Sequence, residues 1–175
     1  MEPTFQAPGT KINDGYIVPA QTQIGHVHLK VSNLERSLEF YRDLLGFQVT
    51  SLYGDQAAFL SAGGYHHHIG LNTWHSKDAP PAPVDGVGLY HVAIRYPVRK
   101  DLAIIFDRLR RENYPLSGAS DHGVSEAIYL YDPDNNGLEL YWDRPRESWK
   151  YHENGFVEMV TKPLDLRGLL SELQK

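Results

Sequence analysis

The chain has 175 residues, a length that fits one domain or two small modules sharing a core. Hydrophobic residues make up 41% of it and charged residues 22%, which excludes a disordered chain. There is no cysteine, so disulfide scaffolds, thiolate zinc sites and cysteine nucleophiles are excluded. The net charge is −5 without a strong Lys/Arg cluster, so we expect no nucleic-acid partner. No long apolar run or signal-peptide pattern is present, so we expect no membrane association and a cytoplasmic location.

The sequence contains two copies of one pattern. In the first copy an alternating segment, residues 26–31, precedes apolar residues at helical spacing that end at Gly46. The second copy repeats this pair at residues 91–96 and 102–109. Strand-like segments follow each helix, at 48–53, 57–60 and 66–73 and then at 117–119, 127–131 and 137–143. The pattern predicts an α+β fold of two βαβββ modules, whose mixed sheets form a curved cup around a metal site.

The repeat also defines the domain boundaries. We expect a single domain over residues 23–149, with module one at 23–85, module two at 86–149 and a proline-rich linker between them. Residues 1–22 form an N-terminal arm and residues 150–175 a C-terminal tail with a short helix. Either flank could pack on a partner subunit, cover a pocket or run along its own domain. A small domain with two such flanks favours a homodimer or higher homo-oligomer.

Three side chains can converge inside the cup. The alternate apolar residues of each strand face the helix, so His26, His91 and Glu139 face the other way. Two imidazoles and one carboxylate are the donor set of non-haem Fe(II) sites, which leaves open positions for substrate and oxygen. The equivalent placement of the two histidines strengthens this interpretation. His28 also faces the cup, either as a ligand or hydrogen-bonded to a neighbour.

These features resemble the vicinal oxygen chelate superfamily, which is also the glyoxalase/bleomycin resistance/dioxygenase superfamily and pairs βαβββ modules around a metal. The resemblance covers residues 24–149. Its motifs in module one are Ile24-Gly25-His26-Val27, Leu34–Tyr41 and Leu45-Gly46-Phe47. Those in module two are Tyr90-His91-Val92-Ala93, Tyr129-Leu130-Tyr131-Asp132-Pro133 and Asn136-Gly137-Leu138-Glu139-Leu140. The superfamily includes isomerases, epimerases, resistance proteins and dioxygenases.

Further residues resemble the type I extradiol catechol dioxygenase branch. By that match His67 falls on the acid–base histidine, Tyr129 on the active-site tyrosine and His122 on another active-site histidine. The resemblance implies a metal-dependent catechol 2,3-dioxygenase that cleaves a small aromatic diol with O2. It implies Fe(II) as the cofactor, with Mn(II) as the alternative, and His26, His91 and Glu139 as the ligands.

Two alternatives stay open. Strand alternation sends His66 and His68 inward, so His67 acts only if a bulge re-aims it, and His68 is the other acid–base candidate. His68 also falls at the repeat position of Glu139, where metal-dependent isomerases of the superfamily carry a fourth ligand. The rival functions are therefore a glyoxalase-like isomerase or lyase, and a resistance protein that binds a small molecule without needing the triad.

Overall fold

The computed structural model describes residues 15–83 and 85–175. The first fourteen residues of the expected N-terminal arm lie outside this part, and residues 15–22 form neither helix nor strand. Among the described residues, no helix has the length and apolar character that crossing a membrane would require.

Module one contains one short helix and a four-stranded sheet. In chain order its elements are β1 (Val27–Lys30), α1 (Leu34–Leu38), a π-helical segment (Glu39–Leu44), β2 (Gln48–Tyr53), β3 (Ala57–Ser61) and β4 (Ile69–Asn72). The strand order is β1-β4-β3-β2, with β1 parallel to β4 and the other pairs antiparallel. The side chain of Asn33 accepts a hydrogen bond from the backbone N–H of Arg36 at 3.0 Å, which explains why α1 begins there.

Module two repeats this order with a longer helix and an added edge strand. Its elements are β5 (Val92–Arg95), α2 (Arg99–Arg111), β6 (Leu116–Asp121), β7 (Ser125–Tyr131), β8 (Gly137–Asp143), a 3-10 turn (Arg146–Ser148), β9 (Lys162–Pro163), α3 (Leu166–Leu170) and a second 3-10 turn (Ser171–Gln174). The strand order is β5-β8-β7-β6-β9, with β5 parallel to β8. The predicted pair of βαβββ modules is confirmed.

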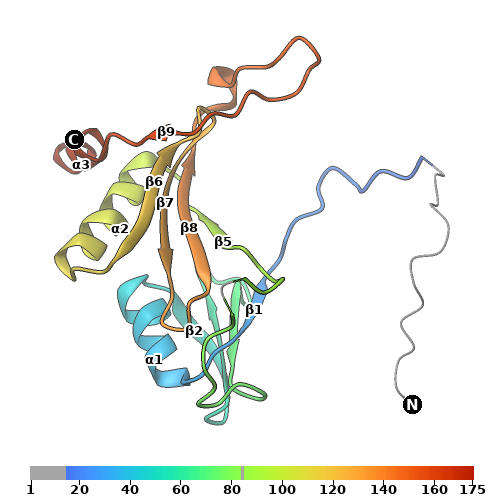
Figure 1. The fold of residues 1–175 in the computed structure, drawn as a ribbon, viewed down its shortest axis with the longest axis vertical. Helices are drawn as coiled ribbons and strands as arrows, with labels where there is room; N and C mark the ends of the chain where they lie inside the picture. The colour runs from blue at the N-terminus through green and yellow to red at the C-terminus, as the bar shows by residue number, and fades with distance from the viewer. Residues whose placement is uncertain (1–14, 84) are drawn as a thin grey trace.

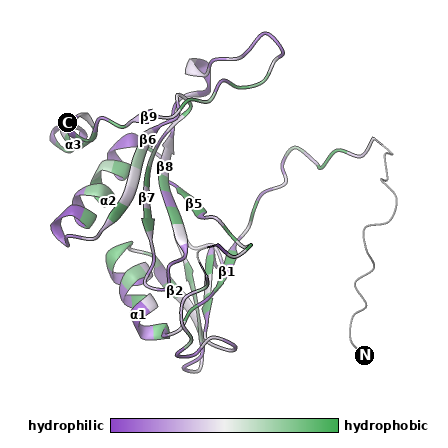
Figure 2. Cartoon of the chain, viewed as in Figure 1, coloured by the Kyte–Doolittle hydropathy of each residue, from purple (hydrophilic) through white to green (hydrophobic). Residues whose placement is uncertain are grey.

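The two sheets share one hydrophobic core but remain open. Helices α1 and α2 lie on the same side of the sheets (Figure 1) and bury their apolar residues against them. In Figure 2 the central strands carry much of the hydrophobic colour, whereas α2 alternates between hydrophobic and hydrophilic positions. Among the described strands, none pairs across the modules, so β1 and β5 are edge strands.

Buried polar contacts fix the modules relative to one another. The Tyr41 hydroxyl donates a hydrogen bond to the Asp132 carboxylate at 2.9 Å, and both side chains are buried. Burial, together with Asp132, raises the pKa of Tyr41 well above its usual value, so the phenol keeps its proton. The hydroxyl of Ser32 and the guanidinium of Arg36 both donate to Asp134 at 2.6 Å. The β7–β8 turn of module two is therefore held against module one.

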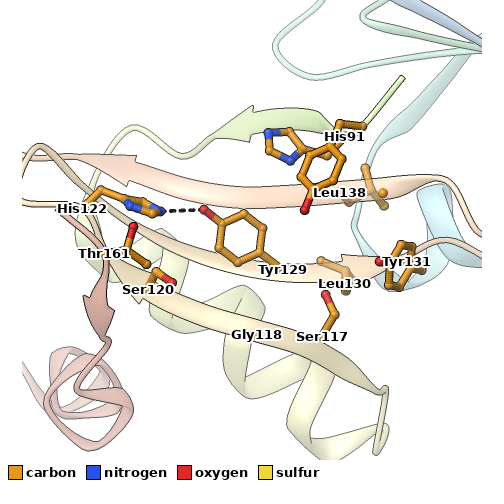
Figure 3. Close-up of a pocket in the computed structure, with 12 residues that line it drawn as sticks. His91, Ser117, Gly118, Ser120, His122, Tyr129, Leu130, Tyr131, Leu138 and Thr161 are labelled. Carbon is orange, nitrogen blue, oxygen red and sulfur yellow. Dashed lines mark hydrogen bonds between the residues drawn. The ribbon is translucent and has the colours of Figure 1, made fainter. Parts of the chain in front are cut away.

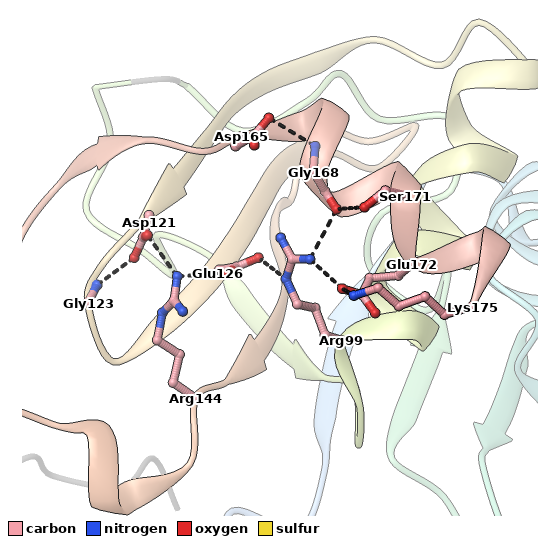
Figure 4. A network of polar contacts seen from close by, with 10 residues as sticks. All are labelled: Arg99, Asp121, Gly123, Glu126, Arg144, Asp165, Gly168, Ser171, Glu172 and Lys175. Atoms are coloured by element: carbon pink, nitrogen blue, oxygen red, sulfur yellow. Dashed lines mark hydrogen bonds and ion pairs between the residues drawn. The ribbon is translucent and has the colours of Figure 1, made fainter.

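The C-terminal tail runs along module two. Leu169 of α3 is fully buried in the common core. Arg99 donates to Glu126 and Glu172, each at 2.8 Å, so α2, β7 and the tail meet at one guanidinium (Figure 4). Arg144 adds 2.8 Å contacts to Glu126 and Asp121. These charge-assisted bonds hold the tail on the sheet that carries His122 and Tyr129.

Candidate metal centre

Two of the three predicted ligands lie together in module two. The Nε2 atom of His91 is 3.0 Å from Oε2 of Glu139. The parallel pairing of β5 with β8 sets Ala93 opposite Glu139, so the side chain of Glu139 reaches His91, the residue directly before β5. Gly137 permits this approach, because a Cβ there would lie only 2.2 Å from the carbonyl oxygen of Tyr90.

Tyr129 and His122 extend this pair into a polar chain. Tyr129 stands opposite Glu139 across β7 and β8, and its hydroxyl is 3.2 Å from Oε1 of Glu139. The same hydroxyl is 2.6 Å from Nε2 of His122 (Figure 3). Both side chains line a cavity of about 430 Å³ together with His91. The structure thus brings His91, Tyr129 and His122 to one cavity, with Glu139 in contact with both His91 and Tyr129.

The tail determines how His122 is oriented. Nδ1 of His122 is 2.8 Å from the carbonyl oxygen of Val160, and a carbonyl only accepts, so Nδ1 carries a hydrogen. Nε2 is thereby left to face the Tyr129 hydroxyl. The backbone N–H of Val160 donates in return to the carbonyl of His122 at 3.1 Å. This contact was not predicted, because a backbone carbonyl thirty-eight residues away leaves no signal in the sequence.

The environment keeps the Tyr129 phenol protonated. Burial, followed by the nearby Glu139 carboxylate, raises the pKa of Tyr129 to about 12. Both causes disfavour a phenolate, since one removes solvent and the other places a negative charge beside the oxygen. At neutral pH Tyr129 therefore keeps its single hydroxyl hydrogen, which it can donate to one acceptor at a time.

The other predicted residues lie together in module one. The ring of His67 packs against His26, with centroids 4.4 Å apart, and against Phe59 at 5.0 Å. Strand β4 begins only at Ile69, so His67 is outside the regular alternation. Burial and then the neighbouring His26 lower the pKa of His67, which favours a neutral imidazole. The Nδ1 atom of His68 is instead 3.1 Å from the hydroxyl of Ser61.

His28 occupies an aromatic niche on the same face. Its ring lies 5.7 Å from Phe59 and 5.6 Å from Trp74, and burial followed by His26 lowers its pKa. A Cβ on Gly70 would lie 2.8 Å from this ring, so glycine makes the room for it. Since β1 pairs His28 with Gly70 as β5 pairs Ala93 with Glu139, Gly70 occupies the place of Glu139 in module one. The sequence repeat put His68 there, and the strand register corrects that.

The donor set fits a divalent metal, but one chain does not assemble it. Two imidazoles and a carboxylate suit Fe(II) or Mn(II). His91 and Glu139 are in contact, whereas His26 lies with His67 in a different cluster. Over residues 15–83 and 85–175, no three metal-ligating side chains come close enough to hold an ion. The structure therefore presents two halves of the predicted site.

A family model and several known proteins match this chain. The family model described as "Glyoxalase/Bleomycin resistance protein/Dioxygenase superfamily" matches residues 23–140. A catechol-2,3-dioxygenase of Bacillus subtilis is 43% identical over 152 residues, which are 86% of this chain and 52% of that protein. A biphenyl-2,3-diol 1,2-dioxygenase of Rhodococcus globerulus is 31% identical over 74% of this chain and 69% of its own length. The chain thus spans about half of the Bacillus protein.

Solved structures agree on the fold. A glyoxalase/dioxygenase from Nostoc punctiforme superposes with a TM-score of 0.61 over 77% of this chain and all of its own, at 16% identity. At that identity the likeness concerns the fold alone.

Proposed function

This chain belongs to the glyoxalase/bleomycin resistance protein/dioxygenase superfamily, and within it we propose that the chain is an extradiol dioxygenase that cleaves a catechol-type diol with O2. The observation that carries the proposal is the contact of Glu139 with His91 and Tyr129, two residues that line one cavity together with His122. The 43% identity to a catechol-2,3-dioxygenase supports the same activity.

His26, His91 and Glu139 would hold the metal, Fe(II) or Mn(II). With one carboxylate among three ligands, a divalent site keeps a net charge near +1, which favours a catecholate over a neutral diol. When bound, the metal would act as a Lewis acid toward the catechol and would exchange electrons with O2.

The protein side chains handle protons and orientation. His67, neutral because burial and His26 lower its pKa, accepts the proton of a catechol hydroxyl. Tyr129, a protonated phenol, donates a hydrogen bond to the oxygen on which negative charge develops, an effect typically worth a few kcal/mol. His122, oriented by the Val160 carbonyl, holds the Tyr129 hydroxyl in place at 2.6 Å.

A glyoxalase-like isomerase or lyase is the rival enzyme. Such a site needs a fourth ligand from module one, and the place equivalent to Glu139 is Gly70, which has no side chain to coordinate a metal. A resistance protein that only binds its ligand would have no use for the pairing of His91 with Glu139. Both observations favour the dioxygenase.

Oxygen uptake tests the proposal. Protein loaded anaerobically with Fe(II) should consume O2 when given a panel of catechols and form yellow ring-opened products. Glu139→Ala should lose the metal, whereas His67→Ala should keep the metal and lose turnover. His152→Ala, which changes an exposed histidine outside the cavity described above, is the matched control and should behave as wild type. Bound Fe(II) without oxygen uptake on any catechol would contradict the proposal.

A further inference from the structure

One arginine that does not line the cavity holds the turn that carries His122. We propose that Arg144 is a positioning residue, which fixes the turn between β6 and β7 and thereby sets the imidazole of His122 against the hydroxyl of Tyr129. The inference rests on the proposed function, in which His122 holds Tyr129 in place. It adds a residue whose loss should slow turnover while the protein keeps its metal.

His122 lies in a short turn and not in a strand. β6 ends at Asp121 and β7 begins at Ser125, and the backbone N–H of His122 donates to the carbonyl of Ser125 at 2.9 Å. The backbone N–H of Arg144, which directly follows β8, donates to the carbonyl of Val124 in this turn at 2.8 Å. The backbone of Arg144 therefore joins the turn to the end of the neighbouring strand.

The side chain of Arg144 binds both strands at the base of the same turn. Its Nη2 atom lies 2.8 Å from Oδ2 of Asp121 and 2.8 Å from Oε1 of Glu126 (Figure 4). These two carboxylates stand opposite each other, because the register of β6 and β7 pairs Asp121 with Glu126. Oδ1 of Asp121 in turn accepts a hydrogen bond from the backbone N–H of Gly123 at 2.8 Å. One guanidinium thus connects the two strands where the turn begins and ends.

Arg144 is itself attached to the core of module two. Glu126 is only 3% exposed, and its second carboxylate oxygen accepts a hydrogen bond from Arg99 of α2 at 2.8 Å. A buried carboxylate needs such partners, because a charge without them is costly to remove from water. The indole N–H of Trp149 also donates to the backbone carbonyl of Arg144 at 2.9 Å. The turn is therefore linked through Arg144 to α2 and to the buried face of β7.

The position of the turn decides whether His122 makes both of its contacts. Its Nδ1 atom lies 2.8 Å from the carbonyl oxygen of Val160, and its Nε2 atom lies 2.6 Å from the hydroxyl oxygen of Tyr129. A displacement of about 1 Å would take either contact beyond hydrogen-bond length. A misplacement of that size in an active site can reduce turnover by about 100-fold. Holding this turn in place therefore bears on turnover as well as on stability.

A double-mutant cycle tests this role in the full chain loaded anaerobically with Fe(II). Arg144→Gln should lower kcat with a catechol by about tenfold or more and leave the Fe(II) content unchanged, because it alters no ligand. In a His122→Ala background the same change should have no further effect on kcat, since no imidazole remains to be positioned. Arg110→Gln is the matched control, because it removes an exposed arginine that pairs with Asp107 within α2, and it should leave kcat at the wild-type value.

A second variant breaks the same contact from the other side. Asp121→Asn removes the charge that pairs with Arg144, keeps an oxygen for the backbone N–H of Gly123, and leaves the buried Glu126 with both of its arginines. It should lower kcat in the wild-type background and have no effect beside His122→Ala. If Arg144→Gln does not fold, this variant decides the question by the same comparison.

Nitrogen NMR measures the positioning of His122 without turnover. In ¹⁵N-labelled wild-type protein without Fe(II), at alkaline pH, the imidazole should be a single tautomer with its hydrogen on Nδ1, as the bond to the Val160 carbonyl requires. Arg144→Gln should show a mixture of the two tautomers, whereas Arg110→Gln should keep the single one.

The outcomes separate this inference from the proposed function. An unchanged kcat in Arg144→Gln, or the same fold loss with and without His122, would overturn the inference, because Arg144 would then not act through His122. A single Nδ1–H tautomer retained in Arg144→Gln would overturn it as well. If wild-type protein with bound Fe(II) cleaves no catechol, the proposed function is wrong, and the NMR comparison still decides whether Arg144 positions His122.

Discussion

The substitution Gly137→Ala should disable the metal centre without changing a ligand. The added Cβ would lie 2.2 Å from the carbonyl oxygen of Tyr90 and 3.2 Å from Cβ of His91. Unbonded heavy atoms do not approach so closely, and the first contact is with backbone, so the start of β5 must move away from β8 by about 1 Å. His91 moves with that segment and withdraws from Glu139.

The expected effect is larger on function than on stability. Overpacking of this kind costs about 1–3 kcal/mol of folding free energy, which for a chain of this size lowers the melting temperature by about 2–4 °C per kcal/mol. A ligand displaced by about 1 Å can reduce turnover by about 100-fold. Fe(II) content and oxygen uptake should therefore fall well before the protein unfolds.

The control is Gly88→Ala, where an added Cβ meets no atom within 4 Å. It should leave metal content and oxygen uptake at wild-type values. A Gly137→Ala protein with wild-type metal content and turnover would refute the reasoning, because it would mean that the spacing of β5 and β8 does not position His91.

Two further predictions concern stability. Tyr41→Phe removes the donor to the buried Asp132 carboxylate and should lower the free energy of unfolding, measured in urea, by about 1.5–3 kcal/mol. An unchanged free energy of unfolding would contradict a stabilising bond between the modules. Burial alone would raise the pKa of Asp121, but the backbone N–H of Gly123 and the Arg144 guanidinium outweigh it and hold that pKa below its usual value. A carboxyl group whose pKa is lowered by folding stabilises the fold at a pH above its unfolded-state pKa. This stabilisation is lost as the pH falls through the lowered value. Arg144→Gln should therefore destabilise the protein at pH 6 more than at pH 2.5, and an equal loss at both would show that the pairing contributes nothing.

Much of the fold follows from the sequence because its two modules obey simple periodicities. The strands at 48–53 and 137–143 have the bounds that alternation predicts. The strand predicted over 66–73 is shorter, Ile69–Asn72, although the backbone of His68 already exchanges hydrogen bonds with Val27 and Leu60 of the neighbouring strands. The π-helical segment after α1 was also not predicted, since apolar spacing alone does not distinguish a π turn from an α turn.

The strand faces on which the candidate residues lie were predictable, whereas the way those residues come together was not. The alternation of side chains along each strand placed His26, His91 and Glu139 on the face turned away from the helices. The contact between His91 and Glu139 agrees with that placement. The spacing of apolar residues in a helix or strand does not show how the two modules pack together. That packing depends on the bond between Tyr41 and Asp132, which are ninety-one residues apart. The role of the tail in orienting His122 depends on a backbone carbonyl and is equally invisible in the sequence.

Isotopically labelled oxygen gives the most direct test of the proposed activity. Fe(II)-loaded protein would be given a catechol under labelled O2, and the product mass would be measured. Extradiol cleavage predicts a ring opened beside the two hydroxyls, with both atoms of one O2 molecule in the product. A product without labelled oxygen, or a ring opened between the hydroxyls, would contradict the account.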